Sequence, residues 1–179
     1  MRAPTGSTLL IGGARCGKSA LAVRLALAWG GPVTFVATAE VADDDFAARV
    51  RRHRADRPST WPTVEEPREV AAAVRDVDPE HLVLVDCISL WVSALMADGI
   101  DEDGAVAAAD DLADAFAARR APVLVVTNEV GMGVHPSTSL GREYRDVLGR
   151  VNRRLAERVD RALLVVAGRV LPLLSQEDA

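Results

Sequence analysis

Eight consecutive residues near the start of the chain have the types and spacing needed to bind a nucleotide triphosphate. Residues 12–19 fit the pattern G-x-x-x-x-G-K-[ST] at each fixed position. Glycines let successive backbone N–H groups turn toward phosphate oxygens, and the N-terminus of a following helix adds partial positive charge. Lys18 would reach the β- and γ-phosphates, and the Ser19 hydroxyl would ligate Mg²⁺. The predicted phosphate loop consists of Gly12, Gly13, Ala14, Arg15, Cys16, Gly17, Lys18 and Ser19.

The segments on either side of this loop have the order that the chemistry requires. Residues 8–11 form an apolar run typical of a buried strand, and residues 20–28 are strong helix formers. Lys18 is the only lysine in the chain, whose 21 basic residues are otherwise arginine. A compact ammonium and a planar guanidinium are not interchangeable at a triphosphate. Lysine at this one position therefore favours the phosphate-binding interpretation.

A carboxylate follows a second apolar run. Residues 82–85 are Leu-Val-Leu-Val and lead into Asp86, which is the form of a Walker B strand. The acid at the end of such a strand holds Mg²⁺ directly or through a water molecule. Asp86 and Ser19 are therefore the predicted metal-binding residues.

Two more predicted strands should end at the same edge of the sheet, where ligands of doubly wound sheets bind. Residues 33–38 form one of them, and residues 122–127 form the other. The first leads into Ala37, Thr38 and Ala39, and the second into Asn128, Glu129 and a glycine-rich loop. That loop is either substrate-binding apparatus or an ordinary connection.

Residues 49–57 contain five arginines and one histidine against a single aspartate. One interpretation is an exposed basic face, with an RNA-contact patch as a variant. In the other, the guanidinium groups clamp a triphosphate, and His53, kept neutral by its positive neighbours, attacks phosphorus. His81 and His135 have weaker claims, and we interpret both as structural or exposed.

The whole pattern predicts an α/β fold, a P-loop NTPase-like and mostly parallel twisted sheet flanked by helices. We expect one domain spanning residues 1–179. Further helices are predicted near residues 43–54, 68–75, 88–97, 101–118 and 142–159, further strands at 162–166 and 170–173, and irregular structure at 61–67. The arginine-rich face of the helix at 142–159 is expected to face solvent or another subunit.

Composition excludes several classes of function. The formal net charge of −5 argues against a general nucleic-acid binder. No apolar run approaches the ~20 residues of a membrane span, and the first residues lack the apolar centre of a signal peptide. The positions of Cys16 and Cys87 suggest neither a disulfide framework nor a metal site, so a cytoplasmic location is expected.

Taken together, several separated motifs closely resemble one family, the bifunctional adenosylcobinamide kinase/adenosylcobinamide-phosphate guanylyltransferases of cobalamin biosynthesis. The resemblance covers almost the whole chain. The matching segments are residues 12–19, 36–39, 49–54, 57–58, Trp61, 85–87, 127–133, 145–146 and 149–152.

The resemblance implies a transferase with two activities. It would phosphorylate the aminopropanol hydroxyl of adenosylcobinamide, using ATP or GTP with Mg²⁺, and then transfer GMP from GTP to that phosphate through a guanylylated histidine. By position, His53 is that nucleophile, with Lys18 and Asp86 also catalytic. The implied nucleotide-contacting positions beyond the phosphate loop are Ala37, Thr38, Ala39, Arg54, Ala55, Asp56, Arg57, Glu65 and Asp86. The family also implies a homotrimer with the active site near a subunit boundary.

One departure from the family pattern is Cys16, where serine is usual, and we expect sensitivity to oxidation there. Some relatives keep the transferase activity alone, so kinase activity follows less directly from the resemblance. Without the resemblance, the residues would indicate a Mg²⁺-dependent small-molecule kinase, or a nucleotide-dependent switch that binds RNA through residues 49–57.

Overall fold

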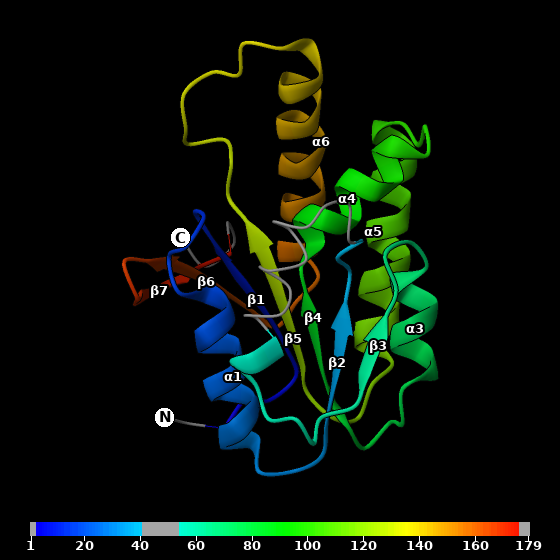
Figure 1. The fold of residues 1–179 in the computed structure, drawn as a ribbon, viewed down its shortest axis with the longest axis vertical. Coiled ribbons are helices and arrows are strands. Elements are labelled where there is room, and N and C mark those ends of the chain that lie inside the picture. Colours follow the sequence, from blue (N-terminus) through cyan, green and yellow to red (C-terminus); the bar gives the residue numbers. More distant parts are fainter. Residues whose placement is uncertain (1–2, 41–53, 176–179) are drawn as a thin grey trace.

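A seven-stranded sheet organises the part of the chain that the computed structural model describes, residues 3–40 and 54–175 (Figure 1). The strand order is β3-β2-β4-β5-β1-β6-β7; all neighbouring pairs are parallel except β6 and β7. The strands are β1 (Ser7–Gly12), β2 (Val33–Ala37), β3 (Thr63–Glu65), β4 (Leu82–Asp86), β5 (Val123–Asn128), β6 (Arg161–Val166) and β7 (Arg169–Leu173). The predicted mostly parallel sheet is confirmed. The helix predicted at 43–54 lies mainly outside the described residues.

Helices cover both faces of the sheet, as expected. They are α1 (Lys18–Trp29), α3 (Val70–Asp76), α4 (Ile88–Ala97), α5 (Glu102–Ala117) and α6 (Ser139–Ala156). In β4, Val83 and Val85 belong to the apolar cluster beneath α3 to α6, whereas Leu82 and Leu84 belong to the cluster beneath α1. Successive side chains of a strand point to opposite faces, so a run that is apolar throughout can only be buried on both sides.

The segment predicted to be irregular, residues 61–67, contains a short strand. β3 pairs with β2, and Phe35 N–H donates to Pro62 O at 2.9 Å. Three residues between two prolines are too few to give a periodic signal, so the strand is defined by its pairing with β2 rather than by its own pattern.

Arginines on α6 pair with acids on α5 rather than facing only solvent or another subunit. The pairs are Arg150 with Glu102, Arg154 with Asp110 and, just after α6, Arg158 with Asp114. Exposed pairs contribute little individually, but this set fixes the relative orientation of the two helices. No helix among residues 3–40 and 54–175 is both long and apolar enough to cross a membrane.

Arg119, just after α5, binds the C-terminal end of α3 and the turn that leads from α3 into β4. Its guanidinium donates four hydrogen bonds to backbone carbonyls, and burial lowers its pKa. The acceptors are Val74, Val77, Asp78 and His81, at 2.6 to 3.0 Å. The carbonyls at this end of α3 therefore obtain their partners from one side chain.

Replacing Arg119 with alanine should lower the free energy of unfolding by about 2–4 kcal/mol, because partly buried carbonyls lose charged donors. Arg119→Lys should recover part of this loss, since an ammonium cannot span the same four acceptors. Arg120→Ala is the matched control, because Arg120 is exposed and has only a 3.7 Å ion pair with Glu80. Urea unfolding measures all three; equal stability of the alanine variants would contradict the assignment.

Candidate nucleotide site

The phosphate loop lies between β1 and α1, as the sequence predicts. β1 ends at Gly12 and α1 begins at Lys18. A Cβ atom on Gly12 would lie 2.2 Å from Val165 O of β6, so only glycine fits there. Gly17 has φ 102°, a left-handed conformation that L side chains rarely adopt. Both fixed glycines of the pattern are therefore required by the backbone.

Lys18 turns back under the loop. Its Nζ donates to Gly12 O and Gly13 O, both at 2.7 Å, and the residue is 6% exposed. These two bonds hold the ammonium group against the loop, and both acceptors are neutral carbonyl oxygens. A bound phosphate would bring a negative charge to this ammonium group.

The hairpin between β6 and β7 supports the loop from one side. Gly168 N–H donates to Cys16 O at 2.9 Å. Ala167 and Gly168 have φ 49° and 73°, which makes the tight turn that brings this N–H to the loop. The sequence pattern alone did not reveal this contact, because the two segments are about 150 residues apart. A short turn with an Ala-Gly pair was the only local signal.

Asp86 lies at the carboxyl end of β4, in register with Ala37 of β2 and Val126 of β5. Its charge acts on two neighbours. Burial first, and then Asp86, raises the pKa of the Cys87 thiol to about 11. The Cys87 side chain is thus a neutral thiol and no nucleophile at physiological pH.

Arg57 also lies within electrostatic reach of Asp86. Burial and Arg54 lower the pKa of Arg57, whereas Asp86 and Glu65 raise it. The Arg57 guanidinium stacks 3.6 Å above the Phe35 ring and donates to Thr63 Oγ1 at 3.1 Å. These contacts hold a cation over β2 and β3, within electrostatic reach of Asp86.

The structure therefore brings together several predicted site residues from distant segments. Arg54 pairs with Glu65 at 3.7 Å, and Ala55 and Asp56 lie exposed between Arg54 and Arg57. His53 precedes Arg54 directly but lies outside the described residues.

Thr38 has a structural role that the sequence did not indicate. It is 1% exposed; its hydroxyl donates to Cys87 O at 2.7 Å and accepts from Cys87 N–H at 2.8 Å. This exchange joins the ends of β2 and β4. A nucleotide contact by Thr38 stays a prediction, and the side-chain hydroxyl already has two partners.

The polar connection continues to β5. Cys87 Sγ lies 3.0 Å from Ser89 Oγ, which accepts from Asn128 Nδ2 at 2.8 Å. Asn152 of α6 donates to Asn128 O at 3.0 Å, and Tyr144 OH donates to Ser89 O at 2.9 Å. Asn128 thus fixes the strand end, and the substrate-binding role considered for it and for the loop after it stays a prediction.

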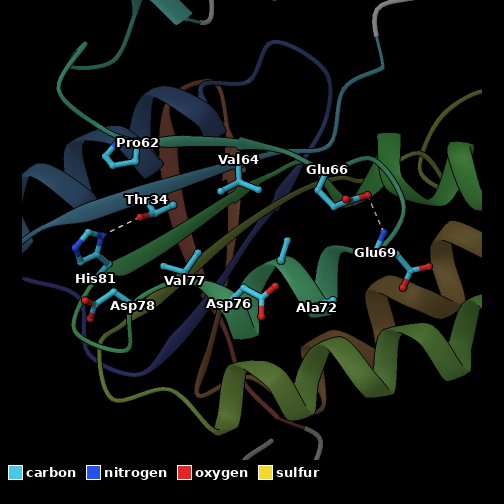
Figure 2. Close-up of a pocket in the computed structure, with 11 residues that line it drawn as sticks. Thr34, Pro62, Val64, Glu66, Glu69, Ala72, Asp76, Val77, Asp78 and His81 are labelled. Carbon is cyan, nitrogen blue, oxygen red and sulfur yellow. Dashed lines mark hydrogen bonds between the residues drawn. The ribbon is translucent and has the colours of Figure 1, made fainter.

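A separate groove of about 410 Å³ lies between β3 and α3 (Figure 2). Four carboxylates line it, Glu66, Glu69, Asp76 and Asp78, together with His81, whose Nδ1 is 2.9 Å from Thr34 Oγ1. Carboxylates disfavour phosphate binding. The residues that line the groove also include none of the phosphate loop, so we treat the groove as separate from the part of the site that holds the phosphates.

Fold and phosphate loop together define the class of P-loop nucleotide-binding proteins. Solved structures with the same fold include a Pyrococcus horikoshii OT3 protein, TM-score 0.58 and 10% identity, covering 100% of this chain and 91% of that one. The bacteriophage phi6 P4 protein in complex with ADP has TM-score 0.51 and 17% identity, covering 92% of this chain and 52% of that one. Such low identities show the fold alone.

Sequence comparisons identify the family within this class. The model for "Cobinamide kinase / cobinamide phosphate guanyltransferase" matches residues 8–173. The Pseudomonas aeruginosa bifunctional adenosylcobalamin biosynthesis protein CobP is 39% identical over 168 residues, covering 92% of this chain and 95% of that protein. Escherichia coli CobU is 38% identical over 173 residues, covering 89% and 95%. The chain belongs to this family, and the resemblance found in the sequence is confirmed.

Cys16 allows the phosphate loop to be probed chemically. It is a free, partly exposed thiol whose Sγ lies 3.7 Å from Lys18 Nζ, whereas Cys87 is buried. Alkylation by N-ethylmaleimide should abolish nucleotide binding because the adduct occupies the loop. Cys16→Ser should resist the reagent and keep its nucleotide affinity within about twofold, as expected of a near-isosteric substitution.

Inactivation rates with and without Mg²⁺–GTP, followed by mass spectrometry, measure this effect. Cys87→Ala is the control and should remain sensitive to the reagent. Full sensitivity of Cys16→Ser would refute the assignment.

Proposed function

We propose that this chain is a transferase of adenosylcobalamin biosynthesis, which phosphorylates cobinamide and then joins GMP to the cobinamide phosphate. The observation that most strongly supports this proposal is the preformed phosphate loop with its buried Lys18, in a chain whose family match spans residues 8–173. The charged side chains gathered around Asp86 at the same sheet edge support a site for a triphosphate.

In the first reaction the cobinamide hydroxyl attacks the γ-phosphorus of a bound ATP or GTP. The hydroxyl proton is released, the new P–O bond forms, and the nucleoside diphosphate leaves. Lys18 and the loop N–H groups hold the phosphates in line. Ser19 and Asp86 would hold Mg²⁺, since a hydroxyl and a carboxylate are the hard oxygen ligands that it prefers. The ion supplies charge neutralisation on the phosphates.

In the second reaction a ring nitrogen of His53 attacks the α-phosphorus of GTP and pyrophosphate leaves. A phosphate oxygen of cobinamide phosphate then displaces the histidine, so a P–N bond is exchanged for a P–O bond. Arg54 and Arg57 follow His53 in the chain, and Phe35 and Thr63 hold Arg57 within electrostatic reach of Asp86. Guanidinium groups in this position favour the extra negative charge of the transition state.

Labelled GTP tests this proposal. The protein is incubated with Mg²⁺ and GTP labelled at the α- or the γ-phosphate, then denatured, and protein-bound label is counted. Label from the α position alone, acid-labile and alkali-stable, is expected because a phosphoramidate has these properties. His53→Ala should carry no label, and His135→Ala is the matched control that should label normally.

The outcomes also separate the alternatives. No α-label on the wild-type protein, together with transfer of γ-label to cobinamide, would leave a simple kinase. α-Label without transfer of γ-label to cobinamide would leave a guanylyltransferase alone. A cytoplasmic homotrimer is part of the same proposal, and light scattering of the purified protein measures its mass.

A further inference from the structure

The segment after β5 extends the site beyond the sheet edge. It runs through residues 129–138 from the end of β5 to the start of α6 and is drawn in yellow beyond the ends of the strands in Figure 1. Its first residue is fixed to the phosphate loop, because Glu129 N–H donates to Gly12 O at 3.0 Å. The start of this segment is therefore beside the phosphate loop, and the rest extends outward from there to α6.

Hydrogen bonds within the segment hold its shape. Glu129 Oε1 accepts from Gly131 N–H and from Met132 N–H, the latter at 3.2 Å. At the other end, Arg142 Nη1 donates to Pro136 O and to Ser137 O, each at 3.1 Å. The backbone is thus preorganised, which lowers the entropic cost of binding.

Three large apolar side chains are exposed on this segment and on the first turn of α6. Met132 is 81% exposed, Val134 is 96% exposed, and Leu140 at the start of α6 is 66% exposed. We call these three residues the apolar rim. Apolar side chains held outward on a shaped segment beside a reaction site are typical of a binding surface.

We propose that the apolar rim contacts the corrin macrocycle of the cobinamide substrate while its hydroxyl-bearing arm reaches the phosphate loop. This inference rests on the proposed function. The reacting hydroxyl ends a flexible arm, so the large ring must lie outside the nucleotide site on whatever surface adjoins it. Met132 and Val134 supply hydrocarbon for the apolar parts of that ring.

Other exposed apolar side chains fit a small molecule less well. Val170, Leu171 and Leu173 lie on β7, the last strand of the sheet. The edge of a sheet offers open backbone groups to another strand, which suits a protein partner. The apolar rim, in contrast, does not lie on a strand. Side-chain hydrogen bonds from Glu129 and Arg142 hold the segment that carries it.

Near-isosteric polar substitutions test the apolar rim without creating space. Met132→Gln and Val134→Thr are combined, and Leu27→Gln on α1 is the control, because Leu27 is also exposed, at 54%. The double variant should raise KM for adenosylcobinamide phosphate about tenfold with kcat nearly kept, as expected for lost apolar contact. GMP labelling from GTP alone should be unchanged.

A truncated acceptor, 1-aminopropan-2-ol phosphate, separates the ring from the reacting group. It lacks the macrocycle, so wild type and double variant should use it equally. Unchanged KM for the full substrate, or an equal loss with the truncated acceptor, would overturn the assignment. So would a change in molecular mass by light scattering, because the apolar rim would then lie between copies of the chain.

Binding of adenosylcobinamide without nucleotide, measured by calorimetry, distinguishes this inference from the proposed function. Absence of GMP labelling in the wild-type protein would refute the proposed mechanism. Corrinoid binding that weakens about tenfold in the double variant would still support the apolar rim, and binding that is equal in both would overturn it.

Discussion

The hydrogen bonds from Lys18 Nζ to Gly12 O and Gly13 O are the interaction on which the site depends. They place a buried positive charge inside the turn that will receive phosphates, and they need a backbone that glycine alone can follow at Gly12. The contact between Gly168 N–H and Cys16 O holds the other side of the turn. The sheet therefore positions the phosphate loop. β1 ends where the loop begins, and β6 with the hairpin that follows it packs against the loop and restricts its shape.

Electrostatics at the sheet edge follow from the same sheet arrangement. Asp86 and Cys87 follow one another at the end of β4, and Arg57 comes from a separate segment, yet the charge of Asp86 acts on both. Burial and then Asp86 raise the pKa of the Cys87 thiol, which keeps it neutral, whereas burial and Arg54 lower the pKa of Arg57 and Asp86 partly offsets that effect. The edge consequently offers hard oxygen and cationic groups, the combination that a magnesium nucleotide requires.

The sequence predicted what depends on local pattern. The phosphate loop, the apolar strands and the helices are fixed by residue types within short windows, and the structure agrees with them in the residues it describes, which leave out most of the helix predicted at 43–54. The sequence could not reveal three other features: Arg119 capping the end of α3, the α5–α6 ion pairs, and the hydrogen bonds between Thr38 and Cys87. Each of them joins segments about 40 to 50 residues apart. The sequence also missed β3, whose three residues are a strand through pairing with β2. Tertiary partners decide all four features, and periodicity carries no information about them.

On the proposed function, one triphosphate site serves two reactions, and these break bonds at two different phosphorus atoms of the nucleotide. If the loop holds the β- and γ-phosphates, the γ-phosphorus lies at the open end of the site and the α-phosphorus lies toward the nucleoside. A single rigid cradle then allows different groups to act at each end without moving the nucleotide. The hydroxyl acceptor must approach from outside, where the segment from Glu129 to Thr138 begins at Gly12. The histidine must approach the α-phosphorus from the arginine-rich segment that ends at Arg57 near Asp86. On the proposed function, the two chemistries therefore use two different segments, one that begins beside Gly12 and one that ends at Arg57.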